Sequence, residues 1–451
     1  MPKLGIVADD LTGCTTIGAL LARVGVDTAV LFSPADVSAL TSDHEALILN
    51  SDSRPLPAAE AYERVRLATQ ELVQAGARQF TKRIDTTCRG GIGPEVEGML
   101  SALPDDYIAI MVPAMPQSRR IVVGGYSLID SVLLARTPVA QDVRTPVKES
   151  HLPTLMAGQC TVGVGHVPIG AVIAGADQIR AGLLASREAG DRVIVVVDAA
   201  SLEDVDLIAT VVAELGWKVV CVDPGPFTER LALRGGVVET RPVKERTLRI
   251  EPADTDRGTA LVVAGSAMRV THLQMVELAA VPGTGVVGVD VGDLIADERH
   301  YTRETQRVLE EVGRLMSQPT KPRVVMLALD STISGDLGDM AAMERRAGLQ
   351  PGEGPGQIPG RFGALARRVI ETLGDGLVGL YLTGGDIMVN TCAALDANGI
   401  RLVDYVIPQA DQGVLVGGPW AGLPVICKGG LTGTSETAIQ CVNRIFDEKM
   451  E

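Results

Sequence analysis

Short apolar runs alternate along the chain with longer segments whose apolar residues recur at helical spacing. Residues 4–8 predict a buried strand, and residues 15–24 have apolar side chains three and four positions apart, which is typical of a helix. Further strands are predicted at 46–50, 78–84, 107–112, 161–167, 192–197 and 218–222, with helices at 58–75, 94–103, 178–186 and 202–215. This alternation predicts an α/β fold with a mostly parallel sheet flanked by helices.

A charged, proline-containing stretch at 238–257 interrupts the pattern, and a second α/β series follows it. Strands are predicted at 260–264, 285–289, 323–329, 377–382, 402–406 and 424–428, and helices at 298–316, 360–373 and 435–446. Residues 351–356 are so rich in glycine and proline that we expect a mobile loop or lid there. We therefore expect two α/β domains, 1–240 and 257–451, each with its own mostly parallel sheet.

Composition narrows the class of protein. The chain has 451 residues, of which 46% are hydrophobic and 22% charged, which is typical of a globular protein. Its net charge of −15 argues against nucleic acid or an anionic membrane as the main partner, and no apolar run is long enough to span a bilayer. With no signal-peptide pattern at the amino terminus, we expect a cytoplasmic protein. The low aromatic content and the share of hydrophobic residues give a weak hint of a homodimer.

Cysteine and histidine spacing gives no metal site. The seven cysteines contain no C-x-x-C pair, and neither they nor the five histidines have the spacing of a zinc site. We expect reduced core thiols, and the metal ligands stay unknown.

Polar clusters follow three predicted strands of the first domain, at 9–10, 52–54 and 82–89. Because the carboxyl ends of neighbouring parallel strands meet at one edge of a sheet, we expect these clusters to line one pocket. Their basic side chains are suited to a carboxylate, which an arginine fork can contact twice, and their acidic ones to a hydroxyl or its proton. The basic residues are Arg54, Lys82 and Arg89, and the acidic ones are Asp9, Asp10 and Asp85.

Simpler interpretations of the same clusters remain open. Asp10 or Thr12 can serve only as the cap of the following helix, which needs no chemistry. Lys82 and Asp85 can form a surface ion pair that contributes little.

Glycine clusters, rather than charges, follow the strands of the second domain, at 265–266, 383–386 and 428–433. Glycine lets backbone amides and a helix N-terminus approach phosphate oxygens closely, and Lys428 would add a positive charge. Neither a Walker A loop nor a G-x-G-x-x-G dinucleotide motif is present. One Gly-Gly pair is usually a simple turn, but two such loops together with Gly265-Ser266 in one domain indicate a phosphate site.

Taken in order, these motifs resemble those of the four-carbon acid sugar kinases. Residues 6–13 are similar to the I-A-D-D-L-T-G opening of that family, and residues 82–93 to its K-x-D-S-T-L-R-G-N-I-G block. The other stretches that resemble family motifs are Ser53-Arg54, Pro113–Pro116 with Arg120, Gly265-Ser266 with Thr271 and Gln274, Gly384-Gly385-Asp386 and Lys428-Gly429-Gly430.

The resemblance implies that the first domain binds the sugar acid and the second binds ATP, with the active site in the cleft between them. It implies ATP-dependent phosphorylation of a hydroxyl on a small, four-carbon sugar acid, with Mg²⁺ as the metal ion. The candidates for the catalytic residues are Asp10 and Asp85. The implied substrate contacts are Asp9, Arg54, Lys82, Asp85, Thr86, Arg89 and Arg120. The implied nucleotide contacts are Ser266, Gly384, Gly385, Asp386, Ile387, Lys428, Gly429, Gly430 and Leu431.

The chain departs from the family pattern at positions that favour two alternatives. On the nucleotide side, Met268 stands where serine is usual and Ile387 where threonine is usual. These changes favour a sugar-acid-binding or regulatory relative that no longer uses ATP. In the first domain, Thr16 and Cys88 replace the usual aspartate and leucine. They favour an enzyme that acts on a different hydroxy acid.

Overall fold

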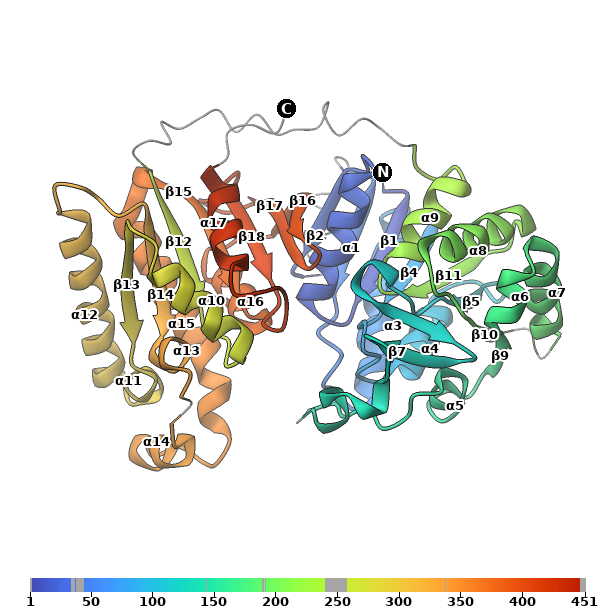
Figure 1. Ribbon diagram of the computed structural model, residues 1–451, viewed down its shortest axis with the longest axis horizontal. Helices are drawn as coiled ribbons and strands as arrows, with labels where there is room; N and C mark the ends of the chain where they lie inside the picture. Colours follow the sequence, from blue (N-terminus) through green and yellow to red (C-terminus); the bar gives the residue numbers. More distant parts are fainter. Residues whose placement is uncertain are drawn as a thin grey trace. The chain divides into compact units, whose positions relative to one another are not determined.

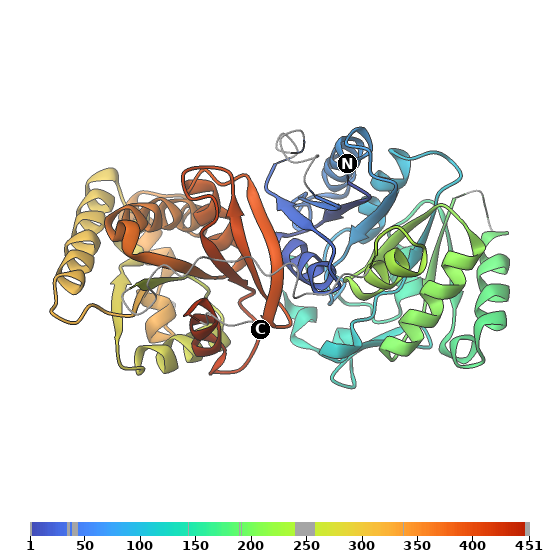
Figure 2. The same cartoon turned by 90° about the horizontal axis from the view of Figure 1, so that it is seen from above.

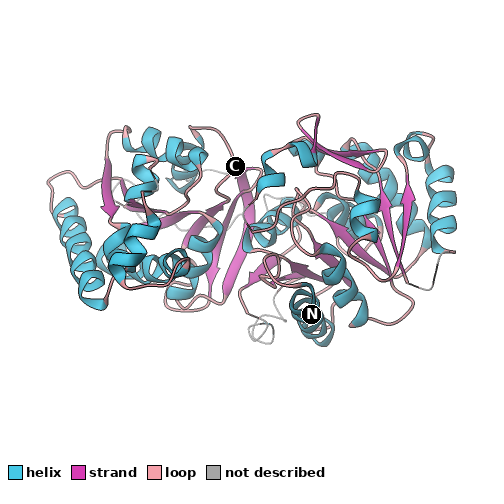
Figure 3. Ribbon diagram, turned by 90° about the horizontal axis from the view of Figure 1, so that it is seen from below, coloured by secondary structure: helices cyan, strands magenta, loops and turns pink. Residues whose placement is uncertain are grey.

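A computed structural model describes residues 2–33, 37, 44–142, 144–188, 190, 192–239, 258–336 and 338–446 (Figure 1). These residues belong to two compact units, Met1–Val243 and Lys244–Glu451. The domain boundary that the sequence places between 240 and 257 lies outside the described residues. Figures 2 and 3 show helices on both sides of the strands in each unit, as an α/β fold requires.

The first unit is built on parallel strands. Their spatial order is β2 (Thr28–Leu31), β3 (Ala46–Asn50), β1 (Leu4–Ala8), β4 (Gln79–Arg83), β11 (Val219–Asp223), β5 (Ile108–Met111), β10 (Val193–Val197) and β9 (Gly163–Val167). The helices that cover them are α1 (Leu11–Arg23), α3 (Ala58–Gln74), α4 (Ile92–Ser101), α5 (Leu152–Ala157), α6 (Ile169–Ile173), α7 (Ala176–Arg187), α8 (Leu202–Leu215) and α9 (Pro226–Arg234). Strands β1, β3 and β4, which end in the polar clusters, are direct neighbours.

Two hydrophobic cores cover the two faces of these strands. In β5, Ala109 and Met111 belong to the core that contains residues of α3 and α4. Ile108 and Ile110 belong to the core that contains residues of α7, α8 and α9. Successive side chains of a strand point to opposite faces, so a strand that is apolar at every position is buried on both sides. This explains why the strands appear in the sequence as short continuous apolar runs.

A small antiparallel sheet, which the sequence does not predict, follows β5. It consists of β6 (Arg120–Val123), β7 (Tyr126–Ile129) and β8 (Val132–Leu133). This sheet holds Arg120 at its start.

The second unit combines parallel strands with an antiparallel edge. The spatial order is β13 (Thr284–Val289), β14 (Val324–Leu329), β12 (Thr259–Ala264), β15 (Leu377–Thr383), β18 (Pro424–Lys428), β17 (Ala410–Val416) and β16 (Gly399–Ile407). β17 runs antiparallel to both of its neighbours, β16 and β18. The helices are α10 (Arg269–Ala279), α11 (Val291–Ile295), α12 (Glu298–Met316), α13 (Asp330–Ser334), α14 (Met340–Ala347), α15 (Glu353–Leu373), α16 (Gly385–Ala394) and α17 (Thr437–Phe446).

The structure corrects one expectation in this unit: residues 351–356 are not an irregular loop, because α15 begins at Glu353. The proline in its first turn is tolerated, since the amides of a first turn have no partner within the helix. The carboxylate of Glu344 satisfies two amides at this helix start, with Oε1 accepting from Gly352 N at 2.9 Å and Gly354 N at 3.0 Å. A long-range contact therefore stabilises a helix that local propensity argues against.

The cysteines and the helix lengths can be compared with what the sequence predicts. All seven cysteines are free, and all except Cys160 are buried, as expected of core thiols. Within the described ranges, the helices lack the combination of length and apolar character that crossing a bilayer requires.

Candidate active site

The turn after β1 places two aspartates at the N-terminus of α1. Asp9 is buried, with 2% of its surface exposed. Asp10 caps the helix, because its Oδ1 accepts a hydrogen bond from Gly13 N at 2.7 Å. Its second oxygen, Oδ2, lies 2.7 Å from Arg54 Nη1. Asp10 therefore has both the capping role and a contact in the polar cluster, and neither interpretation excludes the other.

Arg54 joins the three polar clusters of the first unit. Its Nε donates to Asp9 Oδ2 at 2.7 Å, its Nη1 contacts Asp10, and its Nη2 lies 3.9 Å from Asp85 Oδ1. Because the aspartates occupy Nε and Nη1, the two-point arginine fork expected for a substrate carboxylate is already in use. Nη2 is buried and has no hydrogen-bond partner among the described residues, so it is the nitrogen left for a ligand.

The charges of this cluster control its protonation. Burial alone would raise the pKa of Asp9, but the positive charges of Arg54, Lys82 and Arg83 outweigh burial and hold that pKa below its usual value. The same balance holds for Asp85, where burial is outweighed by Arg54 and Arg89 and the pKa lies well below its usual value. Both carboxylates are therefore anionic at neutral pH.

The loop after β4 is fixed around Asp85. Its Oδ2 accepts from Arg89 Nε at 2.7 Å and from the hydroxyl of Thr87. Arg89 in turn donates from Nη1 to Asp142 Oδ2 at 3.2 Å. Thr86, a predicted substrate contact, is buried in this loop with 6% exposed surface. Asp85 and Arg89 thus lie together, as the strand-end argument predicts.

Lys82 pairs with a carboxylate of α4 and not with Asp85. Its side chain has no exposed surface, and its Nζ lies 2.9 Å from Glu95 Oε2 and donates to Arg83 O at 2.8 Å. The alternative of a surface ion pair with Asp85 is therefore wrong. Glu95 also accepts from Ser53 Oγ at 2.6 Å, so this buried pair ties β4, α4 and the turn after β3 together.

Arg83 is a site residue that sequence reasoning did not single out. It is almost fully buried, and its Nη1 lies 3.5 Å from Oδ1 of both Asp9 and Asp10. A Cβ atom at Gly13 would come within 2.1 Å of the same Nη1. The signal available in the sequence was a charged residue inside a strand whose neighbours are buried, because burying an unpaired guanidinium is costly.

Of the two consecutive arginines that follow β5, only Arg120 lies near the cluster. Arg119 is exposed and pairs with Asp130 on the surface. The Arg120 Nη1 donates to Ser118 O, and its buried Nε has no hydrogen-bond partner among the described residues. Burial lowers the pKa of Arg120, while the charges of Asp130 and Asp85 oppose this shift.

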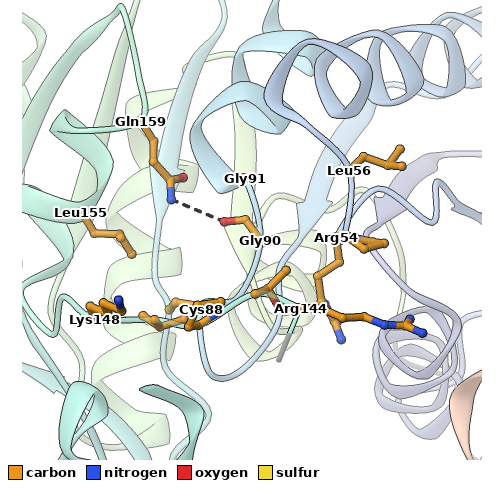
Figure 4. A pocket seen from close by; sticks show the side chains of 13 residues that line it. Arg54, Leu56, Cys88, Gly90, Gly91, Arg144, Lys148, Leu155 and Gln159 are labelled. Atoms are coloured by element: carbon orange, nitrogen blue, oxygen red, sulfur yellow. Dashed lines mark hydrogen bonds between the residues drawn. The ribbon is translucent and has the colours of Figure 1, made fainter. Parts of the chain in front are cut away.

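A cavity of about 220 Å³ lies next to this cluster (Figure 4). Residues that line it include Arg54, Cys88, Gly90, Arg144, Lys148 and Gln159. Gln159 Nε2 donates to Gly90 O at 3.4 Å, across the cavity wall. Pockets for drug-sized ligands occupy roughly 300–1,000 Å³, so this cavity is suited to a smaller molecule. Arg144 and Lys148 gave no sequence signal, because they are isolated basic residues outside any periodic element.

In the second unit, the three glycine clusters meet at one edge. β12, β15 and β18 are parallel neighbours, and their register aligns Ala264 with Thr383 and Thr383 with Lys428. The turns that follow these three residues are the predicted glycine clusters. Thr271 Oγ1 donates to Gly430 O at 3.0 Å, which ties the start of α10 to the turn after β18. Gln274 binds the same turn through Thr432 O at 3.0 Å.

The backbone of these turns fits phosphate groups. Gly384 has a φ of +106°, and no side chain caps α16, so amides of its first turn have no partner within the helix. A Cβ at Gly430 would lie 2.4 Å from Ser266 Oγ, so glycine at this position leaves room for the Ser266 hydroxyl between the two turns. Uncapped amides beside a close glycine turn are what a nucleotide phosphate requires.

The remaining predicted nucleotide contacts have different surroundings. Ile387 is buried with 4% exposure and packs beneath Gly265, whereas Leu431 is exposed, as is Met268, which departs from the family pattern. Lys428 has no exposed surface, and its Nζ donates to Gly429 O at 2.6 Å and Thr432 O at 3.4 Å. Burial lowers the pKa of Lys428 to about 8. The ammonium thus holds its own loop in place.

Comparison with known sequences identifies the class of protein. Residues 4–231 match the family described as "Sugar-binding N-terminal domain", and residues 261–438 match the family described as "Nucleotide-binding C-terminal domain". The chain is 37% identical over 447 residues to a D-erythronate kinase of Heliobacterium modesticaldum, covering 99% of this chain and 98% of that protein. It is 30% identical over 453 residues to a D-threonate kinase of Bordetella bronchiseptica, covering 99% and 98%.

The chain belongs to the four-carbon acid sugar kinase family. Two solved structures share its fold. One, titled a putative tRNA synthase from Salmonella typhimurium LT2, has a TM-score of 0.76 at 21% identity and covers 98% of both chains. The other, a protein of Haemophilus influenzae, has a TM-score of 0.71 at 22% identity and covers 98% of this chain and 99% of that one. At these identities the likeness concerns the fold alone.

Proposed function

We propose that this protein is an ATP-dependent kinase that phosphorylates a hydroxyl group of a small, four-carbon sugar acid. The observation that carries the proposal is the network in which Arg54 contacts Asp9, Asp10 and Asp85 beside a small basic cavity. The relatives named as kinases of D-erythronate and D-threonate support this class of substrate.

In this proposal Asp10 orients the attacking hydroxyl. Its carboxylate is held from two sides, by Gly13 N and by Arg54, and it is more exposed than Asp9. As the hydroxyl oxygen bonds to the γ-phosphorus and the bond to ADP breaks, Asp10 accepts the proton of the hydroxyl. Phosphoryl transfer depends mainly on positioning and charge, so a carboxylate with fixed orientation is what the step requires.

Asp85 and the arginines bind the substrate. The low pKa of Asp85 makes it a poor proton acceptor, so its role is to accept a hydrogen bond from a second hydroxyl. Arg54 offers its buried Nη2 to the substrate, and Arg89 and Arg120 add positive charge near Asp85. Lys82 acts indirectly, by holding Glu95 and the turn after β3.

On the nucleotide side, backbone amides of the turns at Ser266, 384–387 and 429–431 bind the phosphates, and Lys428 holds the last turn from inside. No group of three or more potential metal ligands occurs in the described ranges. Mg²⁺ bound with a nucleotide usually takes only one or two carboxylates, and Asp386, in the first turn of α16, would provide one. When bound, Mg²⁺ neutralises charge on the transferred phosphoryl group.

The substitution Asp10→Asn tests the role of Asp10. Asparagine is an equally good helix cap, so the fold is kept while the negative charge is lost. We expect turnover to fall by about 10²- to 10⁴-fold, with MgATP affinity unchanged. The control Asp177→Asn removes an exposed carboxylate that pairs with Arg180 on the surface of α7 and should leave turnover unchanged. Steady-state rates from a coupled ADP assay measure both, and wild-type turnover in Asp10→Asn would remove Asp10 from the mechanism.

A calorimetric titration tests the alternative that this protein binds a sugar acid but does not use ATP. Isothermal titration of the wild-type protein with millimolar MgATP should release or absorb heat if the protein is a kinase. Absence of binding would favour a sugar-acid-binding or regulatory protein. A screen of three- to six-carbon sugar acids in the same ADP assay then identifies the substrate.

A further inference from the structure

We infer that Arg144 and Lys148 bind the carboxylate of the sugar acid and make the enzyme select acids over neutral polyols of the same length. This inference rests on the proposed function, and it names the part of the substrate that the cavity of Figure 4 accepts.

The charge of the cavity points to an anion. Arg54, Arg144 and Lys148 are among the residues that line it, and none of its lining residues is acidic. This local excess of positive charge occurs in a chain whose net charge is −15. A concave surface lined by one sign of charge raises the local concentration of small ions of the opposite sign. The volume of about 220 Å³ suits a small acid rather than a nucleotide.

Arg144 and Lys148 are available to a ligand. Neither side chain has an ion-pair partner among the described residues, whereas Arg54 and Arg89 are engaged by aspartates. Both lie on the segment 144–148, which contributes all five of its residues to the cavity wall. The cavity therefore has unneutralised cations on one side.

One aspartate fixes this segment to the reaction centre. Asp142 Oδ2 accepts from Arg89 Nη1 at 3.2 Å, and Asp142 Oδ1 accepts from the amides of Arg144 at 3.0 Å and Thr145 at 2.9 Å. Arg89 also binds Asp85, so the backbone of Arg144 is placed relative to the loop after β4. The backbone at Arg144 and Thr145 is held in this way, so the segment that carries the two cations has its place before a ligand binds.

Arg54 connects the cavity with the aspartates. It lines the cavity, and its guanidinium contacts Asp9 and Asp10. An acid whose carboxylate lies between Arg144 and Lys148 can therefore extend its hydroxyls past Arg54 toward Asp10. The geometry explains why the site needs basic residues beyond Arg54, two of whose nitrogens are already occupied.

The variants Arg144→Gln and Lys148→Gln, alone and combined, test this inference in the full-length protein. The probes are D-erythronate and D-threonate, with erythritol and threitol as uncharged analogues. We expect KM for the acid to rise about tenfold in each single variant and more in the double variant, as one charge-assisted hydrogen bond is lost at each position. KM for ATP should stay the same, and the preference for acid over polyol should fall by the same factor as the acid affinity.

Arg136→Gln is the matched control, since Arg136 is an exposed arginine outside the lining of the cavity. Circular dichroism checks that the variants are folded. A double variant with the KM and the acid preference of the wild type would overturn the inference and leave the proposed function intact.

Calorimetric titration with each acid separates failure of the inference from failure of the proposed function. A wild-type protein that binds the acid without turning it over fails the proposed function, and the inference then depends on loss of binding in the double variant. Equal binding by the wild-type protein and the double variant overturns the inference. If the wild-type protein neither binds nor phosphorylates any acid tested, both are overturned.

Discussion

Position 13 shows how a single missing side chain shapes the site. Gly13 lies inside α1, where alanine would be the better helix former. A Cβ there would lie 2.1 Å from Arg83 Nη1 and 2.8 Å from Asp10 Oδ1. Glycine at this position therefore allows a buried guanidinium to lie beside both aspartates.

For Gly13→Ala we expect a loss of about 1–3 kcal/mol in the free energy of unfolding, the usual cost of overpacking, and lower turnover because Arg83 must move. The control is Gly313→Ala in α12, where a Cβ would meet nothing within 4 Å. There, helix propensity should raise stability by up to about 1 kcal/mol. Urea unfolding measures both changes. A stable, fully active Gly13→Ala protein would show that Arg83 does not position the aspartates.

The lowered pKa of Lys428 predicts that the stability of the folded chain depends on pH. Burial lowers its pKa from 10.5 to about 8 in the folded chain. Between these pH values the unfolded chain binds a proton that the folded chain has released, so this group makes stability rise with pH. Below pH 8 both states are protonated, and the full cost of burying the charge remains.

Relative to Lys428→Met, we expect the wild-type free energy of unfolding to rise between about pH 8 and 10.5, by at most roughly 3 kcal/mol. Urea titrations at a series of pH values measure this difference. Parallel pH curves for the two proteins would contradict a lowered pKa at Lys428.

Which site residues can be predicted depends on where they lie in the chain. Asp9 and Asp10 follow an apolar strand directly, and Arg54 lies in the turn after another, so the pattern reveals them. Arg83 lies within a strand, and its importance appears only when Gly13 is seen beside it. Arg144 and Lys148 lie on an irregular segment whose place depends on the long-range contact between Arg89 and Asp142. No local pattern contains that information.

At the scale of elements, the helices with strong apolar periodicity were predicted best. The predicted helices at 202–215 and 298–316 match α8 (Leu202–Leu215) and α12 (Glu298–Met316). β17 (Ala410–Val416) was not predicted, because a glycine and two polar residues obscure its alternation. Its Gly413 is required by the neighbouring strand, since a Cβ there would lie 2.4 Å from Arg401 O.

The turns after β12 and β18 give a prediction about nucleotide binding. A Cβ at Gly430 would lie 2.4 Å from Ser266 Oγ and 3.3 Å from Met268 Cγ, so Gly430→Ala must displace the hydroxyl of Ser266, a predicted nucleotide contact. We expect KM for ATP to rise about tenfold, the effect of roughly 1.4 kcal/mol, while KM for the sugar acid stays unchanged.

Gly356→Ala serves as the control for that experiment. It lies in α15, where a Cβ would meet nothing within 4 Å, so both KM values should remain those of the wild type. Steady-state kinetics with each substrate varied in turn distinguish the two variants. A rise in KM for the sugar acid alone would place the turn after β18 outside the nucleotide site.

At the scale of the whole molecule, the two units should respond to different ligands. We expect a saturating sugar acid to slow amide hydrogen exchange in the turns after β1 and β4 and in segment 144–148. MgATP should slow exchange in the turns after β12, β15 and β18, because bound ligands reduce local opening. Hydrogen-exchange mass spectrometry of the full-length protein measures both. Protection of the second set of turns by the sugar acid alone, with the first set unchanged, would reverse the assignment of the units.

The two α/β halves could be predicted from the sequence because strands such as β1 and β10 are buried along their whole length, and the turns after β1, β4, β15 and β18 are rich in glycine or charge. The start of α15 could not, although residues 360–373 were predicted as a helix, because its first turn depends on Glu344, which lies in a separate helix. Long-range satisfaction of backbone amides decides such cases, and local propensity does not.

The attachment of segment 144–148 has a consequence for engineering. Asp9 forms ion pairs with both Arg54 and Arg83. Segment 144–148, in contrast, is joined to the loop after β4 through the side chain of Asp142. Libraries that randomise positions 144–148, with residues 9–10 and 82–89 left unaltered, therefore offer the most direct evolutionary route to kinases for new acids.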